Sequence, residues 1–294
     1  MATPRGWDND RDGTVDLVYA GDLLGNIWKF DLSSGTPGTW DSSFKTGSTL
    51  NPFFIAKDSS NVVQPITGGL TIGLNPTTFE RWVFFGTGRY LTASDPSNLQ
   101  TQSWYGLIDA GTAITSGRSA LKQRSIVVQT TASGSAVRAF EAATAGDMVG
   151  KQGWYVDLLG LPGNVQQGER IVSDSALFSN VLLAASIIPD SSSACAAGGR
   201  GYINAIDPFT GASLGGTFFD VNRDGSFTAA GDNVAYGSGN LPVGSIDLGV
   251  DMPSIPAIID KLLVAGGSAG TIGSIGVNNP GGGGRISWRE LVGD

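Results

Sequence analysis

The sequence contains no histidine and a single cysteine, Cys195, among its 294 residues. Without histidine the chain cannot build a Ser-His-Asp triad, a Cys-His dyad or a histidine-ligated zinc site. One cysteine cannot form a disulfide within the chain. These two absences exclude several familiar designs of hydrolases and zinc enzymes.

Basic residues are also scarce: 18 Lys and Arg stand against 26 Asp and Glu, for a formal net charge of −8. Because the basic residues form no stripe, nucleic acid is not an expected partner. No apolar run is long enough to span a membrane. The N-terminal MATPRGWDND lacks the apolar core of a signal peptide, so we expect any secretion signal to lie outside this sequence, on a longer protein.

Long helical periodicity is absent, whereas short segments rich in β-branched and aromatic residues recur between Gly, Asp, Asn and Pro. This pattern predicts an all-β protein. One or two helical turns are expected in 119–124 and 139–150, and an irregular path through 245–260, where two prolines interrupt the chain. The expected strands lie in 14–21, 26–32, 80–88, 103–109, 124–131, 153–159, 169–174, 180–189, 201–208, 261–267 and 285–291.

A strand–turn–strand unit that ends in Asp-x-x-x-Gly appears at 20–35 and again at 198–214. Such units are typical of β-propeller blades, although the hairpins of a β-sandwich carry similar signals. Blades take about 40–50 residues, so about six would fit. Fewer can be traced, because insertions stretch the spacing. We predict that residues 1–294 form one domain, a modified β-propeller with quinoprotein-like blades and insertions, whose ring this chain need not close by itself.

Four aspartates crowd the segment DNDRDGTVD at 8–16. In EF-hand loops, positions 1, 3 and 5 offer side-chain oxygens, position 6 is Gly and position 7 offers a backbone carbonyl. These positions correspond here to Asp8, Asp10, Asp12, Gly13 and Thr14, and a further carboxylate, Asp16, follows. A cation would turn the mutual repulsion of these carboxylates into coordination. The segment therefore predicts a Ca²⁺ loop, with a solvated acidic turn as the alternative.

A near-copy of this pattern, DVNRDGSFTAAGD, lies at 220–232. Asp220, Asn222, Asp224 and the carbonyl of Ser226 take the same positions, and Asp232 is the candidate closing carboxylate. Asp232 comes one residue later than the glutamate of an EF-hand. This segment is therefore a second candidate Ca²⁺ loop, again with a plain turn as the alternative. Mg²⁺ is less suited to either loop, because it prefers rigid octahedral sites and retains its waters.

Apparent catalytic motifs are incomplete. The segment GGSAG around Ser268 resembles a nucleophile elbow, but no histidine exists to activate the hydroxyl. The surroundings of Lys151 lack the spacing of a phosphate-binding loop. Asp95, Asp109 and Asp157 are more typical of turns and strand ends than of a glycosidase pair. We therefore expect no enzymatic activity and no catalytic residues.

Taken in order, several segments resemble the C-terminal domain of the PilC/PilY family of type IV pilus biogenesis factors and tip adhesins. The resemblance covers essentially the whole chain. The segments are DNDRDGTVDLVYAGDLLGNIWKFDL, VFFGTGRYL, QSWYGLID, GWYVDL, GERIVSD, IIPDSSSAC, GGRGYINAIDPFTG and RISWREL.

This resemblance implies a modified β-propeller whose calcium loop corresponds to Asp8, Asp10, Asp12, Thr14 and Asp16. It implies a protein of the pilus tip or bacterial surface that promotes pilus extension against retraction, twitching motility and adhesion, under the control of Ca²⁺ occupancy. Minor pilins, the pilus machinery and the host-cell surface are the implied partners. Family members are longer and carry a variable N-terminal region.

Two other functions fit parts of the sequence. Quinoprotein dehydrogenases have similar blades and a Ca²⁺ ion beside the quinone, but many carry a vicinal cysteine pair, and this chain has only Cys195. The other alternative is a calcium-stapled structural domain of a different surface adhesin.

Overall fold

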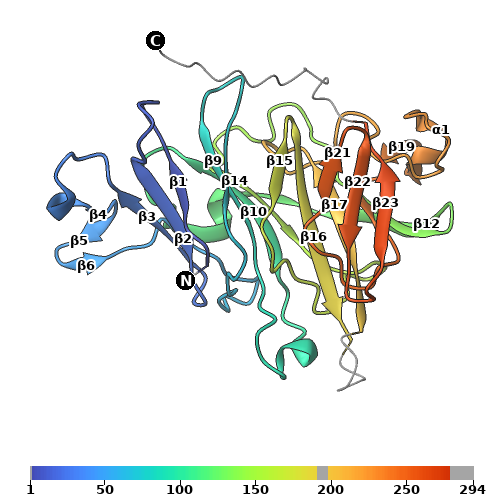
Figure 1. Ribbon diagram of the computed structural model, residues 1–294, viewed down its shortest axis with the longest axis horizontal. Coiled ribbons are helices and arrows are strands. Elements are labelled where there is room, and N and C mark those ends of the chain that lie inside the picture. The colour runs from blue at the N-terminus through green and yellow to red at the C-terminus, as the bar shows by residue number, and fades with distance from the viewer. Residues whose placement is uncertain (1, 191–197, 279–294) are drawn as a thin grey trace, which may run out of the picture.

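The structure is a computed structural model that describes residues 2–190 and 198–278. Within these ranges nearly all regular structure is strand, as the sequence predicts. Four larger sheets make up the molecule, with the first at the left of Figure 1 (blue) and the fourth at the right (red). Their strand pairs are antiparallel except for β11 and β14 in the second sheet, which are parallel. The helices in these ranges are single turns: η1 (Pro37–Thr39), η2 (Asp95–Ser97), η3 (Gly117–Ala120) and α1 (Ala229–Asp232).

The first two sheets have five strands each. The first sheet contains β1 (Arg5–Trp7), β2 (Leu17–Gly21), β3 (Asn26–Asp31), β4 (Asp41–Ser42) and β7 (Phe54–Ile55). The second contains β8 (Thr71–Leu74), β9 (Arg81–Gly86), β10 (Ser103–Asp109), β11 (Lys122–Arg124) and β14 (Gly153–Asp157).

The third sheet has six strands and the fourth has three. The third contains β12 (Ile126–Ala132), β13 (Ser135–Phe140), β15 (Ala176–Phe178), β16 (Val181–Pro189), β17 (Gly199–Ile206) and β20 (Ser245–Ile246). The fourth contains β21 (Ala257–Ile259), β22 (Leu262–Gly266) and β23 (Ile272–Gly276). Two separate hairpins pair β5 (Lys45–Thr46) with β6 (Thr49–Leu50), and β18 (Asn233–Tyr236) with β19 (Gly239–Pro242).

Three apolar cores lie between the four sheets, because strand alternation sends neighbouring side chains to opposite faces. In β9, Val83 and Phe85 join the first core, shared with the first sheet, while Trp82 and Phe84 join the second core, shared with the third sheet. The third core, between the third and fourth sheets, includes Val137, Leu183, Ile203, Leu263 and Ile275. The second and third sheets are therefore buried on both faces.

The two Trp-Tyr pairs follow the same alternation. Trp104 and Trp154 pack together edge to face in the second core, with ring centroids 5.9 Å apart. Tyr105 and Tyr155 lie in the first core. All four side chains are buried, so both faces of the second sheet are packed rather than one being open for ligand stacking.

Most of the predicted strands are present, but 169–174 is not one of them. Arg170 makes only an isolated bridge with Ile187. Its buried guanidinium donates to the carbonyls of Gly168, Arg89 and Asn98, among others, and this fixes the segment as a packed loop. The predicted strand 285–291 lies outside the described residues, as does Cys195.

The expected helical turns are partly wrong. A 3-10 turn, η3, overlaps the start of 119–124, but the rest of that segment enters β11. The segment 139–150 begins as the end of β13 and continues in turns. Residues 122–124 pair with β14, and residues 139–140 pair with β12, because these tertiary hydrogen bonds outweigh a weak local helix preference. Residues 245–260 are irregular except for β20 and β21.

Candidate metal sites

The first acidic loop joins β1 to β2, two neighbouring strands of the first sheet. Arg11 and Gly13 adopt positive φ angles of 66° and 92°, which fold the loop back on itself. Their backbone N–H groups donate to the two carboxylate oxygens of Asp8, at 2.6 and 2.9 Å. The sequence Asp-x-x-x-x-Gly therefore closes a compact turn around the Asp8 carboxylate.

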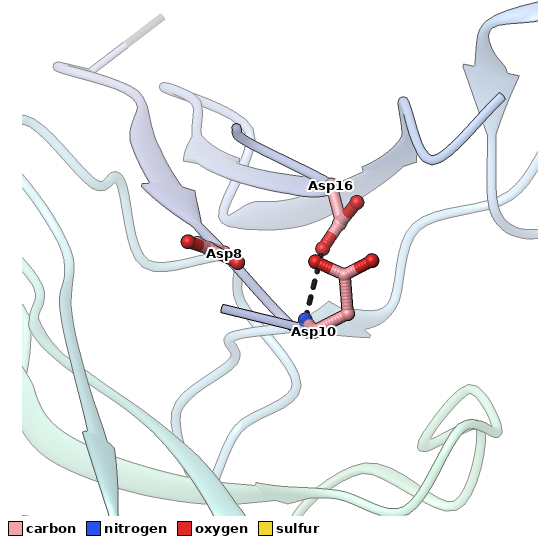
Figure 2. Close-up of side chains that lie close together, drawn as sticks. All are labelled: Asp8, Asp10 and Asp16. Atoms are coloured by element: carbon pink, nitrogen blue, oxygen red, sulfur yellow. Dashed lines mark hydrogen bonds between the residues drawn. The ribbon is translucent and has the colours of Figure 1, made fainter. Parts of the chain in front are cut away.

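Asp16 closes the loop from the other side. Its side chain is buried, with 8% of the residue exposed, and it accepts hydrogen bonds from the backbone N–H groups of Asn9, at 2.6 Å, and Asp10, at 3.3 Å. Figure 2 shows the second of these bonds and the Asp10 carboxylate beside Asp16.

The Asp8, Asp10 and Asp16 carboxylates each offer an oxygen, and these three oxygens lie within 4.8 Å of one another (Figure 2). Ligands at 2.3–2.6 Å from one Ca²⁺ ion lie at most about 5 Å apart, so this spacing fits a shared ion. The donor set is also suitable, because Ca²⁺ prefers hard oxygen ligands. The residues present therefore fit the predicted ion.

Asp12 lies outside this group of three. Its Oδ1 accepts hydrogen bonds from the backbone N–H of Thr14, at 2.8 Å, and from its hydroxyl, at 2.6 Å. These two bonds, the side-chain one first, lower the pKa of Asp12 below its usual value. Coordination by Asp12 and by the Thr14 carbonyl stays a prediction.

The loop is also tied to the second sheet. Arg81, at the start of β9, donates from Nη1 to Oδ1 of Asn9 at 2.7 Å and pairs with the buried Asp109 at 3.2 Å. Asp109 in turn pairs with Lys29 at 2.7 Å and accepts a hydrogen bond from Tyr19. Burial alone would raise the pKa of Asp109, but these partners, Lys29 first, lower it. The sequence pattern gave no sign of this network.

The second acidic loop repeats the backbone geometry of the first. Arg223 and Gly225 have positive φ angles of 60° and 78°, like their counterparts Arg11 and Gly13. Asp220 accepts hydrogen bonds from the N–H groups of Asp224, at 3.1 Å, and Gly225, at 3.0 Å. Asp220 therefore has the place that Asp8 has in the first loop.

Asp232 occupies the position in the second loop that Asp16 occupies in the first, although segment 220–232 is longer than segment 8–16. Its Oδ1 accepts hydrogen bonds from the N–H groups of Val221, at 2.7 Å, and Asn222, at 3.4 Å. Only 1% of Asp232 is exposed, and its Oδ2 has no hydrogen-bond partner among the described residues. Burial, together with the charges of Asp220 and Asp224, raises the pKa of Asp232 against the lowering effect of the two hydrogen bonds.

The remaining members of the second loop lie on its exposed side. Nδ2 of Asn222 donates to Oδ2 of Asp224 at 2.8 Å, and Oδ1 of Asp224 accepts from the N–H of Ser226 at 2.8 Å. The structure therefore brings the side chains of the second predicted set into one loop, while coordination by them and by the Ser226 carbonyl stays a prediction.

Asp95, Asp109 and Asp157 lie in three separate ion pairs. Each ends a strand or starts a turn and has its own cationic partner: Arg89 for Asp95, Lys29 and Arg81 for Asp109, and Arg118 for Asp157. In the described part of the chain, no helix has the length and apolar character needed to cross a membrane.

Comparison with known proteins agrees with the resemblance seen in the sequence. Residues 1–140 match the family model described as the PilY1 beta-propeller domain. A type IV pilus biogenesis factor PilY1 homolog of Xylella fastidiosa is 37% identical over 97% of this chain and 22% of its own length. The type IV pilus biogenesis factor PilY1 of Pseudomonas aeruginosa is 29% identical over 83% of this chain and 23% of its own length.

A solved structure supports the fold. The crystal structure of the Pseudomonas aeruginosa PilY1 C-terminal domain aligns with a TM-score of 0.74 and 24% identity, over 94% of this chain and 60% of that chain. The all-β, modified propeller predicted from the sequence is thereby confirmed, while the extent of one domain over 1–294 stays a prediction. The chain spans about a fifth of the length of the curated relatives it matches. By its sequence, the chain belongs to the PilY1 family, and its residues 1–140 match the PilY1 beta-propeller domain.

Proposed function

We propose that this chain is the calcium-responsive part of a type IV pilus biogenesis factor. In this proposal it acts at the pilus tip or bacterial surface, promotes pilus assembly and extension, and supports twitching motility and adhesion. Minor pilins and the pilus machinery are its partners, and the host-cell surface is a further one. The observation that carries the proposal is the group of Asp8, Asp10 and Asp16 oxygens within 4.8 Å, in a chain of the PilY1 family.

Asp8, Asp10 and Asp16 would hold the ion, and Asp12 and the Thr14 carbonyl are further ligands on the predicted pattern. The ion would neutralise carboxylates that otherwise repel one another, and so favour the closed loop over open ones. A ligand that binds one conformation raises its population in proportion to its differential affinity. Calcium would thus set how often the exposed face of the loop has the shape that a pilus component recognises.

The connection through Arg81 gives this change a route into the fold. Asn9, inside the loop, shares Arg81 with the buried Asp109. An ordered loop therefore keeps Asn9 in place against the second sheet, and an open loop releases it. The proposed role is binding and regulation rather than catalysis, in keeping with relatives that are named biogenesis factors.

Titration calorimetry on the purified chain, stripped with chelator, tests the calcium site. The double variant Asp10→Asn, Asp16→Asn keeps the shape of both side chains but removes two charges, and should weaken the affinity of this loop by tenfold or more, as expected where ligand charge tunes affinity. Asp31→Asn is the matched control, because Asp31 is an exposed aspartate that accepts hydrogen bonds from Ser33 much as Asp12 does from Thr14. Unchanged binding in the double variant would refute the calcium site.

A bacterium that produces the full-length protein tests the pilus role. The same double substitution should reduce the number of surface pili and the twitching zone at millimolar calcium, whereas Asp31→Asn should not. Normal piliation and motility, with calcium binding lost in the purified chain, would refute the regulatory role and leave a calcium-stapled domain of a surface protein.

A further inference from the structure

We propose that the second loop, 220–232, is a structural calcium site that joins the fourth sheet to the β18–β19 hairpin, independently of the first loop. Its ligand is a hard divalent cation held by the carboxylates of Asp220, Asp224 and Asp232 and by the side-chain oxygen of Asn222. It would act on the stability of the fold, whereas the role proposed for the first loop is regulatory.

The unpartnered oxygen of Asp232 is the first observation. A buried carboxylate oxygen without a hydrogen bond is costly, because it has lost its water and gained nothing in return. Oδ1 of Asp232 accepts hydrogen bonds from the N–H groups of Val221 and Asn222, but Oδ2 has no hydrogen-bond partner in the described ranges. With 1% of Asp232 exposed, bulk water does not supply that partner, and a cation in the loop would.

The shared backbone pattern is the second, independent observation. Asp232 bonds the two N–H groups that follow Asp220, just as Asp16 bonds the two N–H groups that follow Asp8. In the first loop this pattern gathers three carboxylate oxygens within 4.8 Å. In the second loop Asn222 stands where Asp10 stands in the first, so one negative charge is exchanged for a neutral oxygen ligand.

The position of the loop assigns it a structural role. On one side, the N–H of Asp220 donates to the carbonyl of Gly276, at the end of β23, at 2.9 Å. On the other side, the carbonyl of Asp232 accepts from the N–H of Val243, just after β19, at 3.1 Å. The buried side chains of Phe219 and Val221 flank Asp220 and pack in the third core. An ion held by Asp220 and Asp232 would therefore connect two separately paired pieces of sheet above that core.

Calorimetry separates the two loops. The unsubstituted chain should bind two Ca²⁺ ions, and the double variant Asp10→Asn, Asp16→Asn should keep one. Adding Asp232→Asn or Asp224→Asn to that variant should remove the remaining site. Asp232→Asn preserves the acceptor for Val221, and Asp224 is exposed, so failure of one variant to fold leaves the other to decide. Asp31→Asn in the same background is the control.

Thermal melting gives a second measurement that does not depend on the first loop. In the Asp10→Asn, Asp16→Asn background, calcium should raise the melting temperature by several degrees over chelator. Adding Asp232→Asn to this background should abolish the rise. In chelator, the resulting triple variant should melt at or above the temperature of the Asp10→Asn, Asp16→Asn variant, because Asp232→Asn removes an unpaired buried charge.

The outcomes distinguish this inference from the proposed function. If the first-loop variant binds no calcium and its melt does not respond to chelator, the second loop is an ordinary turn and only the present inference fails. If that variant binds calcium as the unsubstituted chain does, with the site removed by Asp232→Asn, the second loop is the calcium site and only the role proposed for the first loop fails.

Discussion

The two acidic loops share a backbone pattern but differ in what surrounds them. The first joins two strands of the first sheet, and Asp10, Asp12, Gly13 and Thr14 are all exposed. The second follows a fully buried Phe219, and its closing Asp232 is 1% exposed. The same local motif is therefore suited to two uses: a loop in solvent can open and close at little cost to the fold, whereas a loop above a core cannot.

The largest expected effect tests this difference at the residue just before each loop. Phe219→Ala removes a buried ring that packs on Phe218, with centroids 4.9 Å apart, and should lower the free energy of unfolding by about 3–5 kcal/mol. Trp7→Ala, at the half-buried Trp7 before the first loop, should cost about 1–2 kcal/mol, since less apolar surface is lost. Urea unfolding in saturating calcium measures both. Equal losses would show that the first loop is as closely joined to a core as the second.

A smaller effect is expected at Arg81, which contacts Asn9 in the first loop and Asp109 in the second sheet. Arg81→Met keeps the aliphatic stem but removes the donor to Asn9, so the first loop should lose calcium affinity by about three- to tenfold, as for one charge-assisted hydrogen bond. Calcium binding by the second loop should not change. Calorimetry on Arg81→Met, with Asp224→Asn added to isolate the first loop, checks this. A loss shared by both loops would contradict their independence.

The smallest expected effect concerns the pKa values of Asp12 and Asp232 in the absence of calcium. The pKa of Asp12 is lowered by the hydrogen bonds from Thr14, so this carboxylate contributes stability above the unfolded pKa of about 3.9 and loses it as pH falls through its folded value. The pKa of Asp232 is raised by burial and nearby charge, so its ionisation destabilises the fold, and protonation below its folded value relieves this. Carbon-detected NMR of the side-chain carboxyls in chelator should show Asp232 titrating above 3.9 and Asp12 below it. The reverse order would contradict the difference in burial.

Much of the local structure could be predicted because the signals are short in range. In β9 and in the two Trp-Tyr pairs, neighbouring side chains lie in different cores, as the alternation of any strand requires. The Gly residues of both loops have the positive φ angles that their position in the motif requires. Where the prediction was wrong, at 169–174, a buried Arg170 satisfies distant carbonyls and holds the segment out of a sheet. No local pattern carries that information.

The sequence by itself determined the all-β character, the family and the two acidic loops, because each depends on residue types at fixed spacing along the chain. Only the tertiary structure decided which carboxylates meet. Asp232 reaches the place of Asp16 across a longer segment, and Asn9 finds Arg81 from another sheet. The tertiary structure also decided how deeply each loop is buried. The exposure of a carboxylate depends on the sheets packed around it, and these sheets come from distant parts of the sequence.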